Sequence, residues 1–182
     1  YLTLHQVLET LSIAVSALVF AVGWKAHSLN PQRNVLLLAC GFLGVAVLDF
    51  SHMLSFAGMP DYITPNSVAK GINFWLPARY LGALTLLGAV ALHWREPGDV
   101  ADPGPGRFAV VALVLAVVAV VHAIVFWFPQ WYPQTYAAQG LTRFKIASEY
   151  GVVALYAASL LLLLRWARER AAFDVARLFA AV

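Results

Sequence analysis

The chain has 182 residues, of which 62% are hydrophobic and only 12% are charged, and its formal net charge is +3. An average soluble domain carries roughly 25% charged residues, so this composition excludes a soluble globular domain and indicates a protein embedded in lipid. The basic residues stand near the ends of apolar stretches and form no basic stripe, which argues against a nucleic-acid-binding surface.

Five apolar stretches are long enough to cross a bilayer, which takes about 20 residues of helix. In chain order they cover residues 2–27, 34–58, 71–94, 107–128 and 143–166. Short turn-forming or charged segments separate them, so neighbouring helices are expected to run antiparallel. A further apolar run after Arg170 predicts the start of a sixth helix. We therefore predict an all-α integral membrane fold, a single domain over residues 1–182 in which five transmembrane helices form an antiparallel bundle.

The distribution of Lys and Arg predicts the orientation of this bundle, because these residues are retained on the cytoplasmic side. Most of them gather at one end, namely Lys25, Arg33, Arg95, Arg107, Arg165, Arg168 and Arg170. The other end has Lys70, Arg143 and Lys145, together with an aromatic segment at 126–136 that is typical of a membrane interface. The N-terminus is therefore expected outside, and the end of the last helix in the cytoplasm.

A small set of ionisable residues lies inside the predicted spans: His5, Glu9, Asp49, His52, Arg79, His122 and Glu149. Such a side chain costs several kcal/mol in hydrocarbon unless it faces the bundle interior and finds a partner, so each is a candidate functional residue. With a rise of 1.5 Å per residue, all of them are expected in one layer roughly 10 Å thick in the outer half of the membrane. A purely structural hydrogen-bonded network, with Arg79 paired to Asp49 or Glu149, is the alternative.

Spacing and charge favour a bound cation in this layer. His5 and Glu9 are four residues apart, and Asp49 and His52 are three apart, so each pair shares one helix face. Three carboxylates face a single Arg79, and this negative excess must be offset by protonation, by cationic histidines or by a bound ion.

Imidazole with carboxylate suits iron, copper or zinc better than magnesium or calcium. We predict metal ligands at His5, His52 and His122, and further ligand-binding residues at Glu9, Asp49, Arg79 and Glu149. In this arrangement Glu149 is a further candidate ligand of the ion, and Asp49 orients an imidazole. A b-type haem held between two histidines is the alternative cofactor.

Four segments of the chain resemble the membrane-associated sensor domains of bacterial signalling proteins, the MASE-type domains of the third class. They are HQVLE at 5–9, DFSHMLSFAGM at 49–59, NFWLPARYL at 73–81 and SEY at 148–150. The resemblance implies a multi-pass sensory module of the bacterial inner membrane with no catalytic activity of its own. It also implies regulation of a cytoplasmic output domain in the same polypeptide, and function as a homodimer.

Together, these observations predict a sensory input domain of a histidine kinase or diguanylate cyclase, as in two-component signalling. It would sense a ligand, a metal ion or a proton at the polar layer, and the chain would be part of a longer protein. The alternative is a membrane redox protein that holds a non-haem metal or haem b at the same residues. A transporter is disfavoured, since paired broken helices are absent from the sequence pattern.

Overall fold

A computed structural model describes residues 2–92 and 106–180, with side chains up to residue 169. It contains five long helices, α1 (Leu2–Leu29), α2 (Arg33–Leu54), α3 (Val68–Ala91), α4 (Arg107–Trp127) and α5 (Arg143–Ala180). Each is long and apolar enough to cross a membrane. The predicted all-α membrane fold is thereby confirmed. Most of the predicted inner loop, with Arg95, and the side chain of Arg170 lie outside the described residues.

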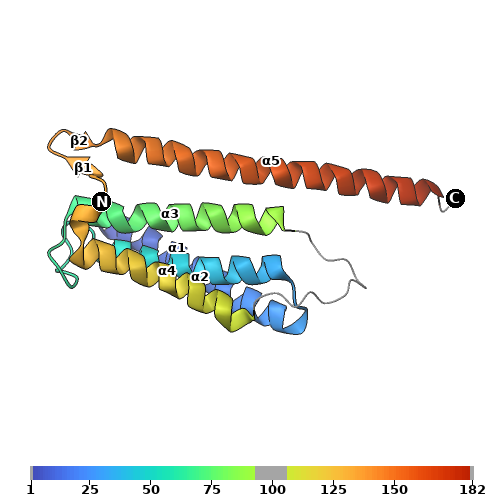
Figure 1. Ribbon diagram of the computed structural model, residues 1–182, viewed down its shortest axis with the longest axis horizontal. Helices are drawn as coiled ribbons and strands as arrows, with labels where there is room; N and C mark the ends of the chain where they lie inside the picture. The colour runs from blue at the N-terminus through green and yellow to red at the C-terminus, as the bar shows by residue number, and fades with distance from the viewer. Residues whose placement is uncertain (1, 93–105, 181–182) are drawn as a thin grey trace.

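The helices run alternately up and down, so that α1, α3 and α5 point one way and α2 and α4 the other (Figure 1). Helix α2 packs against α1, α3 and α4, whereas the main contacts of α5 are with α3. Of the apolar stretch of α2, 61% is buried inside the bundle, against 6% for α1 and 11% for α5. The central helix is therefore α2, and α1 and α5 present most of their surface to lipid.

The core lies where α2, α3 and α4 meet. Its buried cluster consists of Leu48 from α2, Phe74 and Ala78 from α3, and Val118, Val125 and Phe126 from α4. Cys40 packs in a second apolar cluster with Leu36 and Val114, where the free thiol acts as a small apolar side chain. The polar residues of interest are therefore held by a well-packed apolar frame.

The connections at the predicted outer end are more structured than the sequence pattern indicates. Helix α2 ends at Leu54 and not at residue 58, and Gly58 adopts a φ of 101° in the segment that follows. The longer connection from α4 to α5 contains a short 3-10 helix, Pro129–Trp131, and a hairpin of β1 (Tyr136–Ala137) and β2 (Gly140–Leu141). Gly140 turns this hairpin with a φ of 104°, a conformation that favours glycine.

The prediction of a separate sixth helix after Arg170 is wrong for the described residues. The backbone continues as part of α5 to Ala180. The physical reason is local, because the segment from Arg165 to Ala180 contains neither Gly nor Pro and consists largely of strong helix formers such as Ala, Leu, Arg and Glu. A change from an apolar to a basic composition marks the end of a membrane span without ending the helix itself.

The close approach of α2 and α3 predicts that Gly41→Ala destabilises the bundle. A Cβ atom at Gly41 would lie 2.7 Å from Cβ of Thr85, and Thr85 is buried and branched at that atom. The helices must then separate, and overpacking of this kind costs about 1–3 kcal/mol. The free energy of unfolding, measured by denaturant titration in detergent micelles, should fall by that amount.

Gly106→Ala is the matched control, because no described atom lies within 4 Å of the Cβ position there. Gly106 is the N-cap of α4, where Ala is less favourable than Gly, so we expect a loss of at most about 1 kcal/mol for this variant. Equal losses in the two variants would contradict the packing that the structure shows.

Candidate functional site

A group of three potential metal ligands lies near the beginning of α1 and the end of α2, at the predicted outer end of the bundle. One ligand atom from each of His5, Glu9 and His52 can be chosen so that all three lie within 4.8 Å of one another. Nε2 of His52 is 3.8 Å from a carboxylate oxygen of Glu9. The rings of His5 and His52 meet edge to face, with centroids 5.7 Å apart. Two imidazoles and one carboxylate thus converge on one point.

The backbone of α3 determines which nitrogen of His52 faces this group. Nδ1 of His52 lies 2.8 Å from the carbonyl oxygen of Gly71. A carbonyl oxygen can only accept a hydrogen bond, so Nδ1 donates its proton there and Nε2 keeps a lone pair. That lone pair is on the nitrogen near Glu9. The imidazole is therefore held in the tautomer that a metal ion or a proton could bind through Nε2.

The helical period accounts for the α1 half of the group. His5 and Glu9 are four residues apart and share one face of α1. Next to them, Gln6 donates to the carbonyl oxygen of Met53 at 3.4 Å, which ties the same part of α1 to the end of α2. Phe56 covers the His5 ring with a centroid separation of 4.2 Å.

A buried lysine that the sequence analysis counted only for orientation holds the loop above the site. Nζ of Lys70 donates to the carbonyl oxygens of Tyr62 and Thr64, at 2.6 and 2.7 Å, and to the side-chain oxygen of Asn66 at 3.0 Å. Asn66 in turn donates to the carbonyl oxygen of Leu54 at the end of α2. This network closes segment 55–67 over the outer end of the bundle.

Asp49 and Arg79 form a separate ion pair between α2 and α3. Nη2 of Arg79 donates to both carboxylate oxygens of Asp49, whose side chain is fully buried. The guanidinium group also lies over the ring of Trp75, 5.8 Å from its centroid. Asp49 therefore neutralises Arg79, and the prediction that it orients an imidazole is wrong: the carbonyl of Gly71 has that position.

The structure does not bring His122 into the three-residue group, contrary to the sequence prediction. Nδ1 of His122 donates to the carbonyl oxygen of Val118 at 2.8 Å, and Nε2 accepts from the hydroxyl group of Ser51 at 2.7 Å. The ring packs against Phe74, with centroids 5.0 Å apart. Because both nitrogens have partners inside the core, this histidine joins α4 to α2 and lies apart from the His5–Glu9–His52 group.

Glu149 also lies outside the group. It pairs with Lys145 one turn earlier on α5, and Lys145 lies over the ring of Trp75, 4.9 Å from its centroid. The spacing of four residues on one helix is a signal for this pair that the sequence analysis did not use.

These pairings localise the charge imbalance predicted from the sequence. Asp49 is neutralised by Arg79, and Glu149 by Lys145. Among the carboxylates of the predicted layer, this leaves the charge of Glu9, which lies beside His5 and His52. A cation or a proton is therefore best accommodated at these three residues, at the ends of two helices that lie side by side (Figure 1).

Comparison with known protein families gives a match over the whole chain. Residues 1–182 match the family model MASE3, described as a membrane-associated sensor domain. No curated protein and no solved structure matches the chain. The match covers both helices that carry the His5–Glu9–His52 group, together with α3 and α5.

The two carboxylate pairs should differ strongly in their effect on stability. Asp49→Asn leaves the guanidinium group of Arg79 without its buried counter-ion, which costs about 3–5 kcal/mol. Glu149→Gln is the matched control, since the Glu149 side chain is 39% exposed and such an ion pair contributes about 1 kcal/mol or less. Denaturant titration of both variants in detergent measures this difference. Similar values for the two would contradict the assignment of Asp49 as the central buried charge.

Proposed function

Because the chain belongs to the MASE3 family of membrane-associated sensor domains, we propose that it is the sensory input domain of a bacterial signalling protein and that its stimulus is a transition-metal ion bound by His5, Glu9 and His52. The observation that carries the proposal is the convergence of three ligand atoms from two helices. The domain lies in the inner membrane as a homodimer, and its output is a histidine kinase or diguanylate cyclase domain in the same polypeptide.

The ligand set and its surroundings support a metal ion. Two histidines and one glutamate form a known zinc-binding combination that leaves a fourth position open for water. Among transition metals, imidazole with carboxylate suits zinc, iron or copper. The hydrogen bond from His52 to the carbonyl of Gly71 is the kind of outer contact that orients a ligating imidazole and increases its basicity.

The same geometry favours a single ion over haem. The rings of His5 and His52 meet edge to face at a centroid distance of 5.7 Å, and Phe56 lies against the ring of His5. A porphyrin does not fit between two imidazoles that are already in contact. The family match likewise favours sensing over a redox function.

Metal binding would draw α1 toward α2. Ligand atoms around a tetrahedral ion with bonds of about 2.1 Å lie about 3.4 Å apart, whereas Nε2 of His52 on α2 lies 3.8 Å from the carboxylate oxygen of Glu9 on α1. His5 and Glu9 belong to α1, whereas His52 belongs to α2. The contraction therefore acts across the α1–α2 interface and changes the relative position of these helices.

Helix α3 connects this movement to α5. It holds His52 through the carbonyl of Gly71 and Asp49 through Arg79. Next to Arg79, the hydroxyl group of Tyr80 donates to the carbonyl oxygen of Ser148 on α5 at 3.0 Å. A Cβ atom at Gly151 would lie 2.6 Å from that hydroxyl group, so the two helices fit closely there. Ion occupancy at α1 and α2 can thus bias the packing of α5, which continues to Ala180.

We predict that the purified chain binds one Zn²⁺ or Co²⁺ ion and that His52→Ala weakens binding more than about 100-fold, because loss of an outer hydrogen bond alone costs 10–100-fold. Elemental analysis and the visible absorption of bound Co²⁺ measure the occupancy. His122→Ala is the control, since His122 lies outside the group and should leave the affinity unchanged. Binding that is absent, or equal in both variants, would refute the metal stimulus and favour a proton or an organic ligand.

A second experiment tests transmission to α5. Spin labels at the exposed positions Leu18 on α1 and Leu161 on α5, in a Cys40→Ala background, report the distance between these helices. We expect Zn²⁺ to shift the mean distance by about 1–2 Å, the size of helix shifts in comparable switches. The shift should disappear with His52→Ala and persist with His122→Ala. An unchanged distance with the ion bound would contradict the proposed coupling.

A further inference from the structure

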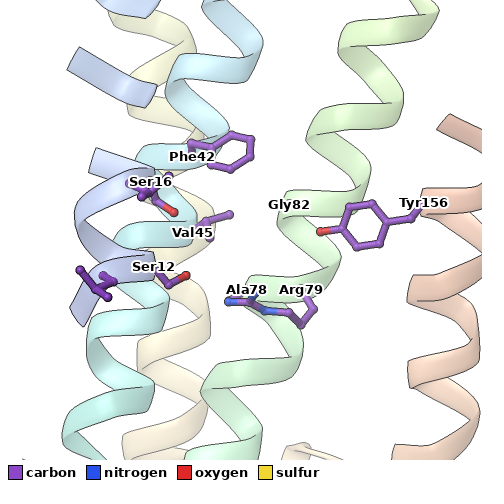
Figure 2. A pocket seen from close by; sticks show the side chains of 10 residues that line it. Ser12, Ser16, Phe42, Val45, Ala78, Arg79, Gly82 and Tyr156 are labelled. Carbon is purple, nitrogen blue, oxygen red and sulfur yellow. The ribbon is translucent and has the colours of Figure 1, made fainter. Parts of the chain in front are cut away.

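A half-open groove lies between α1, α2, α3 and α5, and its volume is about 320 Å³. Its lining is mainly apolar, but the hydroxyl groups of Ser12, Ser16 and Tyr156 and the side chain of Arg79 also belong to it. Figure 2 shows the guanidinium group of Arg79 pointing from α3 toward α1 and α2, and Tyr156 reaching from α5 toward Gly82 on α3.

The hydrogen bonding of Arg79 is incomplete within the described residues. A guanidinium group has five N–H donors, and the bonds to Asp49 come from Nη2 alone. Nε is buried without a hydrogen-bond partner, and the side chain is 27% exposed. In hydrocarbon no water is present to satisfy the remaining donors, so an oxygen acceptor placed in the groove would be stabilised.

The charge of the groove selects a neutral molecule. Arg79 is already paired with the fully buried carboxylate of Asp49. An anion would compete with Asp49 and leave an excess negative charge in a medium of low dielectric constant, and a cation would be repelled by Arg79. A neutral acceptor, such as a ketone oxygen, accepts from the free donors without disturbing the ion pair.

The depth of the groove distinguishes this molecule from the surrounding phospholipids. Arg79 stands 11 residues after the start of α3 and its partner Asp49 five residues before the end of α2, which places the pair about 8–16 Å below the ends of these helices. The ester carbonyls of a phospholipid lie at the edge of the hydrocarbon core, about 15 Å from its centre. Ordinary lipids can therefore offer only acyl chains at this depth, which do not accept hydrogen bonds.

We propose that this groove binds a neutral, lipid-soluble molecule with a carbonyl oxygen, which accepts a hydrogen bond from Arg79 while its apolar body lies between α1 and α5. The volume is at the lower end of the range for small-molecule sites, about 300–1,000 Å³. The molecule enters from the bilayer through the open side. Contact with Tyr156 places it against α5.

Benzophenone is a suitable probe, because it is a neutral ketone that labels C–H bonds near its carbonyl group on irradiation. The full chain in phospholipid nanodiscs is irradiated with benzophenone, and labelled residues are located by mass spectrometry. We expect labelling to concentrate on the groove residues Ser12, Phe42 and Val45, none of which is an exposed lipid-facing residue. Labelling spread evenly over the lipid-facing residues of α1 and α4 would overturn the proposal.

Two further experiments test the two parts of the proposal, namely the hydrogen bond to the carbonyl oxygen and the location of the site. Fluorenone and fluorene have nearly the same shape but only fluorenone has a carbonyl oxygen, so fluorenone should displace the label at about tenfold lower concentration if it bonds to a charged donor. Equal competition by fluorenone and fluorene would mean that the groove binds apolar groups such as acyl chains without using the carbonyl oxygen, and it would overturn the proposal. This test requires no change in the protein.

The second experiment fills the groove with a larger side chain. Ser16 is buried in its lining, whereas Val22 on the same helix is 67% exposed. Ser16→Phe should lower groove labelling at least about fivefold, and the matched Val22→Phe variant should leave it unchanged. Circular dichroism and the lipid-facing background label verify that both variants are folded. Equal labelling in folded Ser16→Phe would contradict the location of the site.

Discussion

The ion pair between Asp49 and Arg79 is the constraint on which the polar structure of this bundle depends. A fully buried carboxylate inside the membrane requires a counter-charge, and Arg79 supplies it from the neighbouring helix. The pair aligns α2 with α3 at one register, because a shift of either helix would separate two buried charges. The carboxylate of Asp49 is thereby bonded to Arg79, and the carbonyl oxygen of Gly71 is the group that bonds to His52.

Three other charged or ionisable residues within the bundle also have partners for their hydrogen bonds or their charge. Lys70 donates three hydrogen bonds to the outer loop, His122 has partners at both nitrogens, and Glu149 is paired with Lys145. Saturated groups stabilise and orient the helices but have little capacity for a ligand. The His5–Glu9–His52 group and the groove beside Arg79 differ from these residues. The first brings three potential ligand atoms within 4.8 Å of one another, and the second adjoins Nε of Arg79, which is buried without a hydrogen-bond partner among the described residues.

Helix α3 links these two places. Its first turns hold His52 through Gly71, its middle carries Arg79, and the next turn approaches α5 at Gly82, where a Cβ atom would lie 3.2 Å from the hydroxyl group of Tyr156. An ion at the outer ends of α1 and α2 and an apolar molecule in the groove would therefore act on the same helix. Because the main contacts of α5 are with α3, a change in α3 caused by either ligand would alter the packing of α5.

The sequence by itself determined the membrane fold, the positions of five spans and the candidate polar residues, because hydropathy and helical spacing are properties of contiguous segments, although it wrongly added the start of a sixth helix. It indicated correctly that His5 and Glu9 share a face, and its resemblance to the membrane-associated sensor domains is confirmed. Only the tertiary structure decided that Asp49 pairs with Arg79, that Glu9 joins the two histidines, that His122 lies apart and that a groove forms beside Tyr156. Those outcomes depend on how each helix is rotated and which helix it packs against, and that choice is made by side-chain packing summed over the whole bundle.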